Sequence, residues 1–283
     1  MRLERMLAMV VLAGICGAAG GASFTVTNGT DVGFGTLREA IQLANSSPGK
    51  DMIDFQIPPT GVPATIQPTN YLPLITDSVM IDGWSQLGAA DCQPGIEIDG
   101  SLAGSGNGLS LWVTTNCEIK GLCINRFNGN GIIINQGGNH RIYGCFIGTD
   151  ITGTNDYGNT NDGIVVVSST GNHIGELPTY SCTNRNIISG NGQNGVQLTT
   201  LAGGACSLNI LQNNHIGTDV NGSYAIPNDR DGVRIDDTNV TGNSIGSIAA
   251  PKPVNVISGN RTNGVYIYLG GNNDVLGNSI GVN

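Results

Sequence analysis

The chain repeats itself at an interval of 69 residues. The segment GCFIGTD that begins at Gly144 returns as NNHIGTD at Asn213, and NIISGN at Asn186 returns as NVISGN at Asn255. Repeats of this kind are typical of architectures in which each unit packs on its neighbours and buries a core that no unit could bury alone. The sequence therefore predicts a stack of similar units, which we call coils.

A shorter pattern shows that each repeat holds two coils. A glycine that opens a short strand recurs at intervals of 32, 32, 37 and 32 residues, at Gly131, Gly163, Gly195, Gly232 and Gly264. The first and third residues after the glycine are always aliphatic, whereas the second varies and includes Arg and Tyr. Because side chains alternate between the two faces of a strand, the first and third positions are expected to face a core and the second to face solvent.

The residue before each glycine is always Asn or Asp, namely Asn130, Asp162, Asn194, Asp231 and Asn263. Asn tolerates left-handed backbone angles, and its amide can bond to the same position of the next unit. These residues are expected to form a polar column at a turn between coils.

Short strands separated by Gly- and Asn-rich turns, with no helix between them, exclude a doubly wound α/β sheet. They predict an all-β fold, namely a right-handed parallel β-helix, or solenoid, with a short N-terminal capping α-helix. The helix is expected over residues 36–45, where Thr36 and Glu39 are spaced as a capping box. One helical stripe there is apolar and would cover the first coil, and its members are Leu37, Ala40, Ile41 and Ala44. An ordinary surface helix is the alternative.

Residues 1–22 have the layout of a secretory signal peptide. Arg2 and Arg5 make its start positive, and the apolar run from Leu7 to Ile15 is too short to span a bilayer. An uncleaved membrane anchor is the alternative, and no integral span is expected once the signal is removed. Residues 23–50 would then hold a first strand and the capping helix, and residues 51–283 the β-helix. Its C-terminal end is expected to be uncapped, in a fragment or in a chain continued by a partner.

Six cysteines remain after Cys16 leaves with the signal peptide: Cys92, Cys117, Cys123, Cys145, Cys182 and Cys206. An even number in an exported chain is compatible with three disulfides. The local pairs Cys117–Cys123 and Cys182–Cys206 are the simplest choices, and buried free thiols are the alternative.

The net negative charge of the chain limits the kinds of partner that it can bind. The chain carries −9 with only 12 Lys and Arg residues, which does not favour binding to nucleic acid or to an anionic membrane.

The N-terminal segment resembles that of bacterial right-handed β-helix repeat surface proteins, some of which carry a Cys-Ser-Leu-Arg-Glu-Ala signature. Residues 36–41 read TLREAI here, and Gly35 stands where that signature has Cys. The IGTD and ISGN coils are similar to repeats of the same proteins, which belong to the pectin-lyase-like superfamily. The resemblance implies the fold and export to the cell surface or beyond. It leaves activity open, because members include polysaccharide lyases, glycosidases and non-catalytic adhesins.

Outward positions on the last two strands of the pattern form the candidate site. Arg234 and Asp236 are expected to lie beside Tyr266 and Tyr268 on neighbouring coils. Tyr rings can stack on sugars, and Arg can pair with a uronate carboxylate. With Asp237 next in the chain, a carboxylate–Arg group for acid–base work is the catalytic version of this hypothesis. A solvated outer face with an Arg–Asp pair is the structural alternative.

Other chemistry has weaker support. Segments such as Asn159-Thr-Asn-Asp only faintly resemble the polygalacturonase pattern, and its Gly-His-Gly element is missing. Asp150 and Asp219, in the Gly-Thr-Asp loops, are candidate Ca²⁺ ligands, and no other cofactor is expected. The three histidines, His140, His173 and His215, are interpreted as turn residues because none has the spacing of a metal site.

The sequence thus predicts a secreted or cell-surface β-helix repeat protein, non-catalytic, that acts as a structural, adhesive or carbohydrate-contacting module. Its expected partner is a polysaccharide or a cell-surface glycan. The alternative is a polysaccharide lyase or glycosidase that uses the face around Arg234 and Asp236.

Overall fold

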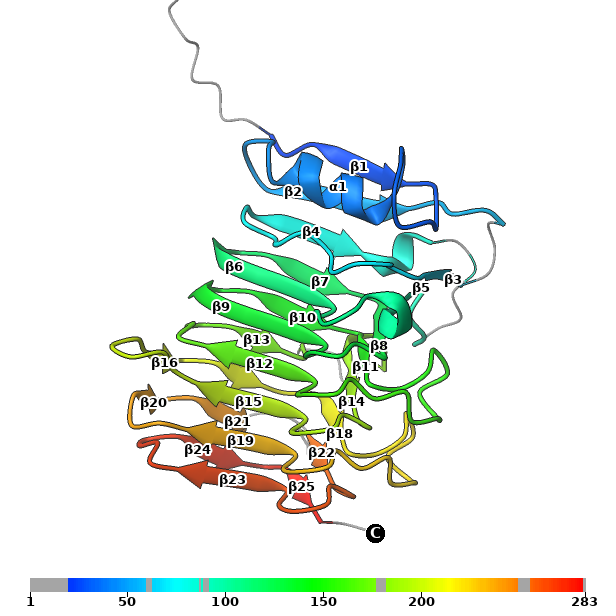
Figure 1. Cartoon of the computed structure of the whole chain (residues 1–283). Coiled ribbons are helices and arrows are strands. Elements are labelled where there is room, and N and C mark those ends of the chain that lie inside the picture. Colours follow the sequence, from blue (N-terminus) through cyan, green and yellow to red (C-terminus); the bar gives the residue numbers. More distant parts are fainter. Residues whose placement is uncertain are drawn as a thin grey trace, which may run out of the picture.

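The computed structural model describes residues 20–59, 63–86, 88, 92–176, 182–248 and 255–281. Within them lie three long parallel sheets of nine, eight and six strands, a two-stranded sheet and one α-helix (Figure 1). The fold is therefore all-β, as predicted. Most of the predicted signal peptide, residues 1–19, lies outside the described residues.

The strands of each sheet come from successive parts of the chain. The nine-stranded sheet holds β1 (Ser23–Val26), β2 (Asp51–Phe55), β4 (Val79–Asp82), β7 (Glu118–Lys120), β10 (Arg141–Tyr143), β13 (His173–Ile174), β17 (Ile210–Leu211), β21 (Ser244–Gly246) and β24 (Asp274–Leu276). The eight-stranded sheet holds β3 (Ala64–Ile66), β5 (Ile96–Asp99), β8 (Leu122–Asn125), β11 (Phe146–Ile147), β14 (Asn186–Ile188), β18 (Asn214–Ile216), β22 (Val256–Ile257) and β25 (Ser279–Ile280).

The six-stranded sheet holds β6 (Leu109–Thr115), β9 (Ile132–Gly138), β12 (Ile164–Val167), β15 (Val196–Thr199), β19 (Val233–Asp236) and β23 (Val265–Tyr268). The short pair is β16 (Cys206–Ser207) with β20 (Val240–Thr241), and three 3-10 turns complete the list: η1 (Gly83–Ser85), η2 (Gly100–Leu102) and η3 (Cys182–Asn184). From β7 onward the chain contributes one strand to each long sheet in turn, and each such passage is one coil.

Aliphatic columns fill the space between the sheets. The first and third positions after the recurrent glycine are fully buried in four coils, as predicted: Ile132, Ile134, Ile164, Val166, Val196, Leu198, Val233 and Ile235. They lie in register from strand to strand. In the last of these strands the equivalent Ile267 is 40% exposed. The second positions are less buried, apart from Val165, which lies in register between Ile133 and Gln197.

The recurrent glycine is required by the close approach of neighbouring coils. A Cβ placed on Gly163 would lie 2.6 Å from Cγ2 of Ile188 and 2.7 Å from the carbonyl oxygen of Gly195. The same crowding meets Gly195, whose added Cβ would lie 2.6 Å from the carbonyl oxygen of Gly232. A side chain here would therefore force the strands apart.

Asparagines form three ladders from coil to coil, and all members except the last of each ladder are buried. In each ladder the side-chain amide of one Asn donates to the side-chain oxygen of the Asn in the next coil, at 2.7 to 3.0 Å. The ladders are Asn172–Asn209–Asn243–Asn273, Asn186–Asn214–Asn255–Asn278 and Asn159–Asn191–Asn228–Asn260. The same amides also donate to buried main-chain oxygens, as Asn191 does to Ile147. The ladders therefore satisfy backbone groups inside the corners, where water has no access.

The predicted Asn/Asp column before the glycines is also confirmed. Asp162 accepts hydrogen bonds from the backbone and side-chain amides of Asn194, both at 2.8 Å. Asp231 accepts the equivalent pair from Asn263, at 3.1 and 2.7 Å.

The predicted helix is present as α1 (Leu37–Ala44), which packs against β1 and β2 at the first end of the sheets (Figure 1). Its apolar stripe is buried in the same core as the aliphatic columns. Thr36 accepts a hydrogen bond from the backbone amide of Glu39, as a capping box requires. In a capping box the Glu39 carboxylate would accept from the backbone amide of Thr36. Here it accepts from the backbone amide of Gly35, at 2.6 Å. No helix among the described residues is long and apolar enough to cross a membrane.

Both simple disulfide pairings were wrong. Cys182 pairs with Cys92, while Cys117, Cys123, Cys145 and Cys206 are buried free thiols, which was the alternative prediction. Cys117 cannot reach Cys123 because they belong to different clusters: Cys117 lies in the main core, and Cys123 lies in a small cluster outside the eight-stranded sheet. Burial raises the pKa of Cys145 to about 12 and that of Cys206 to about 11, which keeps these thiols protonated.

Adjacent valines on β12 test the facing of the strands. Val166→Asp would bury an unpaired charge in the core, whereas Val167→Asp would place it on the outer face between Asn135 and Thr199. We expect Val166→Asp to lower the free energy of unfolding by at least about 3 kcal/mol. Val167→Asp should cost far less. Denaturant unfolding of both variants measures the difference, and equal losses would contradict the assigned facing.

Candidate functional site

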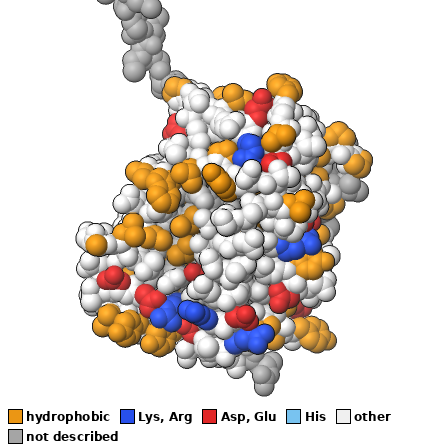
Figure 2. Space-filling view, in the orientation of Figure 1, with side chains coloured by type: hydrophobic (Ala, Val, Ile, Leu, Met, Phe, Trp, Pro, Cys, Tyr) orange, Lys and Arg blue, Asp and Glu red, His pale blue; other side chains and the backbone are white. Residues whose placement is uncertain are grey.

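The outer face of the six-stranded sheet carries two rows of side chains. The first row runs from β6 to β23 and consists of Ser110, Ile133, Val165, Gln197, Arg234 and Tyr266. The second row follows two residues later on each strand and ends at Asp236 and Tyr268. Charged side chains of both signs lie next to one another over the region of β19 and β23 (Figure 2).

The structure brings together the four residues that the sequence grouped. Arg234 pairs in register with Tyr266, and Asp236 pairs with Tyr268. We call these four residues the tyrosine patch. The two Tyr rings are stacked, with centroids 6.5 Å apart and planes 8° from parallel. Tyr268 is 51% exposed, so the patch presents an aromatic surface to solvent.

Arg234, on the neighbouring strand, contacts the Tyr266 ring. Its guanidinium carbon lies 4.9 Å from the centre of the Tyr266 ring, a cation–π distance. Its Nε donates to Asp236 at 2.5 Å, and a second nitrogen pairs with Asp231 at 3.2 Å. The hydrogen bond to Asp236 contributes most to raising the pKa of Arg234.

This arrangement changes the role expected for Arg234. Two carboxylates already occupy its guanidinium, so the patch with Asp231 carries one positive and two negative charges. A uronate carboxylate would meet net negative charge here. The prediction that Arg234 pairs with a uronate is therefore not favoured by the geometry.

Hydrogen bonds hold the pKa of two carboxylates of this region, Asp231 and Asp237, below its ordinary value. Burial raises the pKa of Asp231, but hydrogen bonds from Thr262 and Asn263 outweigh it and hold the pKa below its ordinary value. Hydrogen bonds from Thr200 and from the backbone of Asn239 lower the pKa of Asp237. A general acid requires a raised pKa, so Asp231 and Asp237 are not suited to that role.

The candidate Ca²⁺ ligands organise their own loops. Asp150 accepts hydrogen bonds from the backbone amides of Thr154 and Asn155, both at 3.0 Å. Asp219 accepts the equivalent bonds from Ser223 and Tyr224, at 2.7 and 3.0 Å. Among the residues that the structure describes, no three His, Cys, Asp or Glu side chains gather as a metal site would require.

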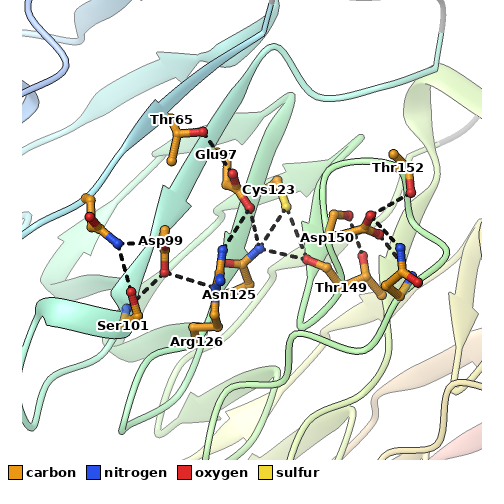
Figure 3. A network of polar contacts seen from close by, with 12 residues as sticks. Thr65, Glu97, Asp99, Ser101, Cys123, Asn125, Arg126, Thr149, Asp150 and Thr152 are labelled. Atoms are coloured by element: carbon orange, nitrogen blue, oxygen red, sulfur yellow. Dashed lines mark hydrogen bonds and ion pairs between the residues drawn. The ribbon is translucent and has the colours of Figure 1, made fainter.

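A polar network links the first of these loops to the eight-stranded sheet (Figure 3). Glu97 accepts hydrogen bonds from Thr65 and from the side-chain amide of Asn125, both at 2.9 Å. The same Asn125 amide donates to the carbonyl oxygen of Thr149, also at 2.9 Å. The loop that follows Asp150 folds back over the outer side of this sheet, where Ile151 and Val220 pack on a small apolar cluster of Cys123, Phe146 and Ile187. At these coils loops cover the outer side of the eight-stranded sheet.

The structure contradicts the interpretation as turn residues for two of the three histidines. His173 and His215 lie in strands, so their interpretation as turn residues was wrong. His140 is fully buried and precedes the Asn172 ladder, because its backbone amide donates to the side-chain oxygen of Asn172 at 3.0 Å. Its Nδ1 accepts a hydrogen bond from the backbone amide of Cys117. Burial lowers the pKa of both His140 and His215 to about 4.

Two residues that support the site escaped sequence analysis. Gln197 donates to Asp236 at 3.0 Å, and Asp231 binds Arg234 from the polar column. Gln197 occupies a second position of the strand pattern, which was the available signal. Asp231 was assigned only to the column, because a contact three residues away is not expected from strand alternation.

No protein-family model matches this chain, and no curated protein matches it.

The buried histidines give a test by pH. Because their pKa in the folded protein lies below the ordinary 6.5, the unfolded chain binds protons first as the pH falls. Lowering the pH from 7 to 4 should reduce the free energy of unfolding by up to about 3 kcal/mol for each histidine. In His140→Asn, which extends the Asn172 ladder, the difference in Tm between pH 7 and pH 4 should shrink. An unchanged difference would contradict this account.

Proposed function

We propose that this chain is a secreted or cell-surface repeat protein that contacts carbohydrate through the tyrosine patch without catalysis. We further propose that its three parallel sheets form a right-handed parallel β-helix of the pectin-lyase-like kind. The ordered passage of the chain through the sheets and the TLREAI segment support this second part.

The stacked pair of Tyr266 and Tyr268 carries the proposal. Both rings project from one strand and are nearly parallel, and the Arg234 guanidinium packs on the Tyr266 ring. An aromatic ring that is fixed before binding loses little conformational entropy when a ligand settles on it. It offers an apolar surface with a polar hydroxyl at its tip, which suits the mixed surface of a sugar.

The charges beside the rings favour a neutral sugar. Arg234 is neutralised by Asp231 and Asp236, and the net negative charge would repel an acidic one. The lowered pKa values of Asp231 and Asp237 support a binding role over acid–base catalysis.

Two observations support export. Residues 1–22 carry the charge and hydropathy pattern of a signal peptide. The Cys92–Cys182 disulfide suits an oxidising compartment outside the cytosol.

Binding of neutral oligosaccharides tests the proposal. Calorimetric titration with cello-, xylo- and galacto-oligosaccharides should find a ligand for the wild type. Tyr268→Ala should weaken that binding by about tenfold or more, because the stacking surface is lost.

Tyr224→Ala is the matched control, because Tyr224 is 76% exposed on a loop away from the patch, and it should bind like the wild type. Equal binding by wild type and Tyr268→Ala would contradict the site. Release of reducing or unsaturated ends that stops in Asp236→Asn would contradict the non-catalytic role and favour the enzymatic alternative.

A further inference from the structure

A buried carboxylate lies on the core-facing side of β2. Asp51 opens this strand and is 1% exposed, and the alternate residues Ile53 and Phe55 are fully buried. Because side chains alternate between the two faces of a strand, Asp51 lies on the same side as these core residues. A carboxylate in such a place requires a partner of opposite charge or a full set of hydrogen bonds.

Asp51 has only part of this. Its Oδ1 accepts hydrogen bonds from the backbone amide of Ala22 at 2.6 Å and from the Ser47 hydroxyl at 3.2 Å. Its Oδ2 has no hydrogen-bond partner among the residues that the structure describes. The next residue in the chain, Lys50, pairs with Glu118 instead. Within the described ranges, no Lys, Arg or His side chain forms an ion pair with Asp51.

Ala22, which donates to this carboxylate, is held on the sheet from both of its ends. Its nitrogen bonds to Asp51, and its carbonyl oxygen accepts a hydrogen bond from the backbone amide of Met52 at 2.8 Å. Gly20 and Gly21, which precede it, are exposed. A cut just before Ala22 would therefore keep β1 paired with β2, and it would turn the nitrogen beside Asp51 into a free amine.

The sequence by itself does not fix the position of the cut. A signal peptidase requires small residues one and three positions before the bond that it hydrolyses, and cuts after Ala19, Gly20, Gly21 or Ala22 all meet this requirement. The first two cuts leave the Ala22 nitrogen in a peptide bond. A cut after Ala22 removes the nitrogen that Asp51 binds. A cut after Gly21 alone places an α-ammonium against the buried carboxylate.

We propose that the exported chain is cut between Gly21 and Ala22, and that the new α-ammonium of Ala22 forms a buried ion pair with Asp51. This inference rests on the proposed export, because the signal peptidase of the exporting cell makes the cut. Water adds across the peptide bond, so that Gly21 leaves with the leader as a carboxylate and the Ala22 nitrogen becomes an amine that takes up a proton.

The ammonium supplies what the amide lacks. An amide nitrogen has one N–H donor and no charge, whereas an ammonium has three donors and a positive charge, which together can serve both oxygens of Asp51. The pairing of β1 with β2 therefore reaches its full stability only after the leader has been removed.

The first residue of the exported protein tests the position of the cut. The full chain is expressed in a bacterial host that exports it, and the protein outside the cytosol is identified by N-terminal sequencing and intact mass. We expect Ala22 to be the first residue. Any other first residue would overturn the inference and leave export standing, whereas a retained leader would overturn both.

Chains with defined N-termini test the ion pair without export. Two chains are released from a cleavable fusion, one beginning at Ala22 and one at Gly21. The chain that begins at Gly21 should have a Tm lower by about 5 °C or more, because its ammonium lies on an exposed residue and Asp51 keeps only an amide donor. Equal Tm values of the two chains would contradict the ion pair.

Variants of the two carboxylates on β2 separate the ion pair from an effect of chain length. In Asp51→Asn the two chains should melt alike, because no charge remains to be paired. Asp54→Asn is the matched control, because Asp54 lies on the same strand with its side chain on the opposite face, and it should keep the difference in Tm. A difference that persists in Asp51→Asn would also overturn the inference.

Discussion

Buried amide ladders are the constraint on which the rest of this structure depends. A chain that turns sharply between short strands leaves main-chain groups at its corners, and inside a dry core each unpaired group costs free energy. Asn is the residue that bonds both to the backbone beside it and to its own copy in the next coil. Asn191, for example, joins Ile147, Asn159 and Asn228 in this way. The ladders thus set the spacing and the register of the coils.

Register in turn determines what lies on the outer faces. Because each strand pairs with its counterpart one coil later, residues that are 32 positions apart become neighbours, as Arg234 and Tyr266 do. The same rule brings Arg141 beside His173 on another sheet. On the outer face of the six-stranded sheet, the result is an arginine neutralised by two carboxylates beside an exposed aromatic pair.

The fold was readable from the sequence where its pattern was periodic. The glycine-linked strands predicted the buried columns, and the stripe from Leu37 to Ala44 predicted the helix. The three Asn ladders were missed because their members look like ordinary turn residues one at a time. The Cys92–Cys182 bond joins residues 90 positions apart, which spacing alone does not indicate.

Hydrogen exchange at the corners tests the central claim most directly. The backbone amides of Asn172, Asn191 and Asn209 each donate to the side-chain oxygen of the next Asn, inside the core. These amides should exchange as slowly as those of the central strands, because only opening of the stacked coils exposes them. Exchange as fast as that of the exposed loop residue Asn221 would show that the ladders do not hold the coils together.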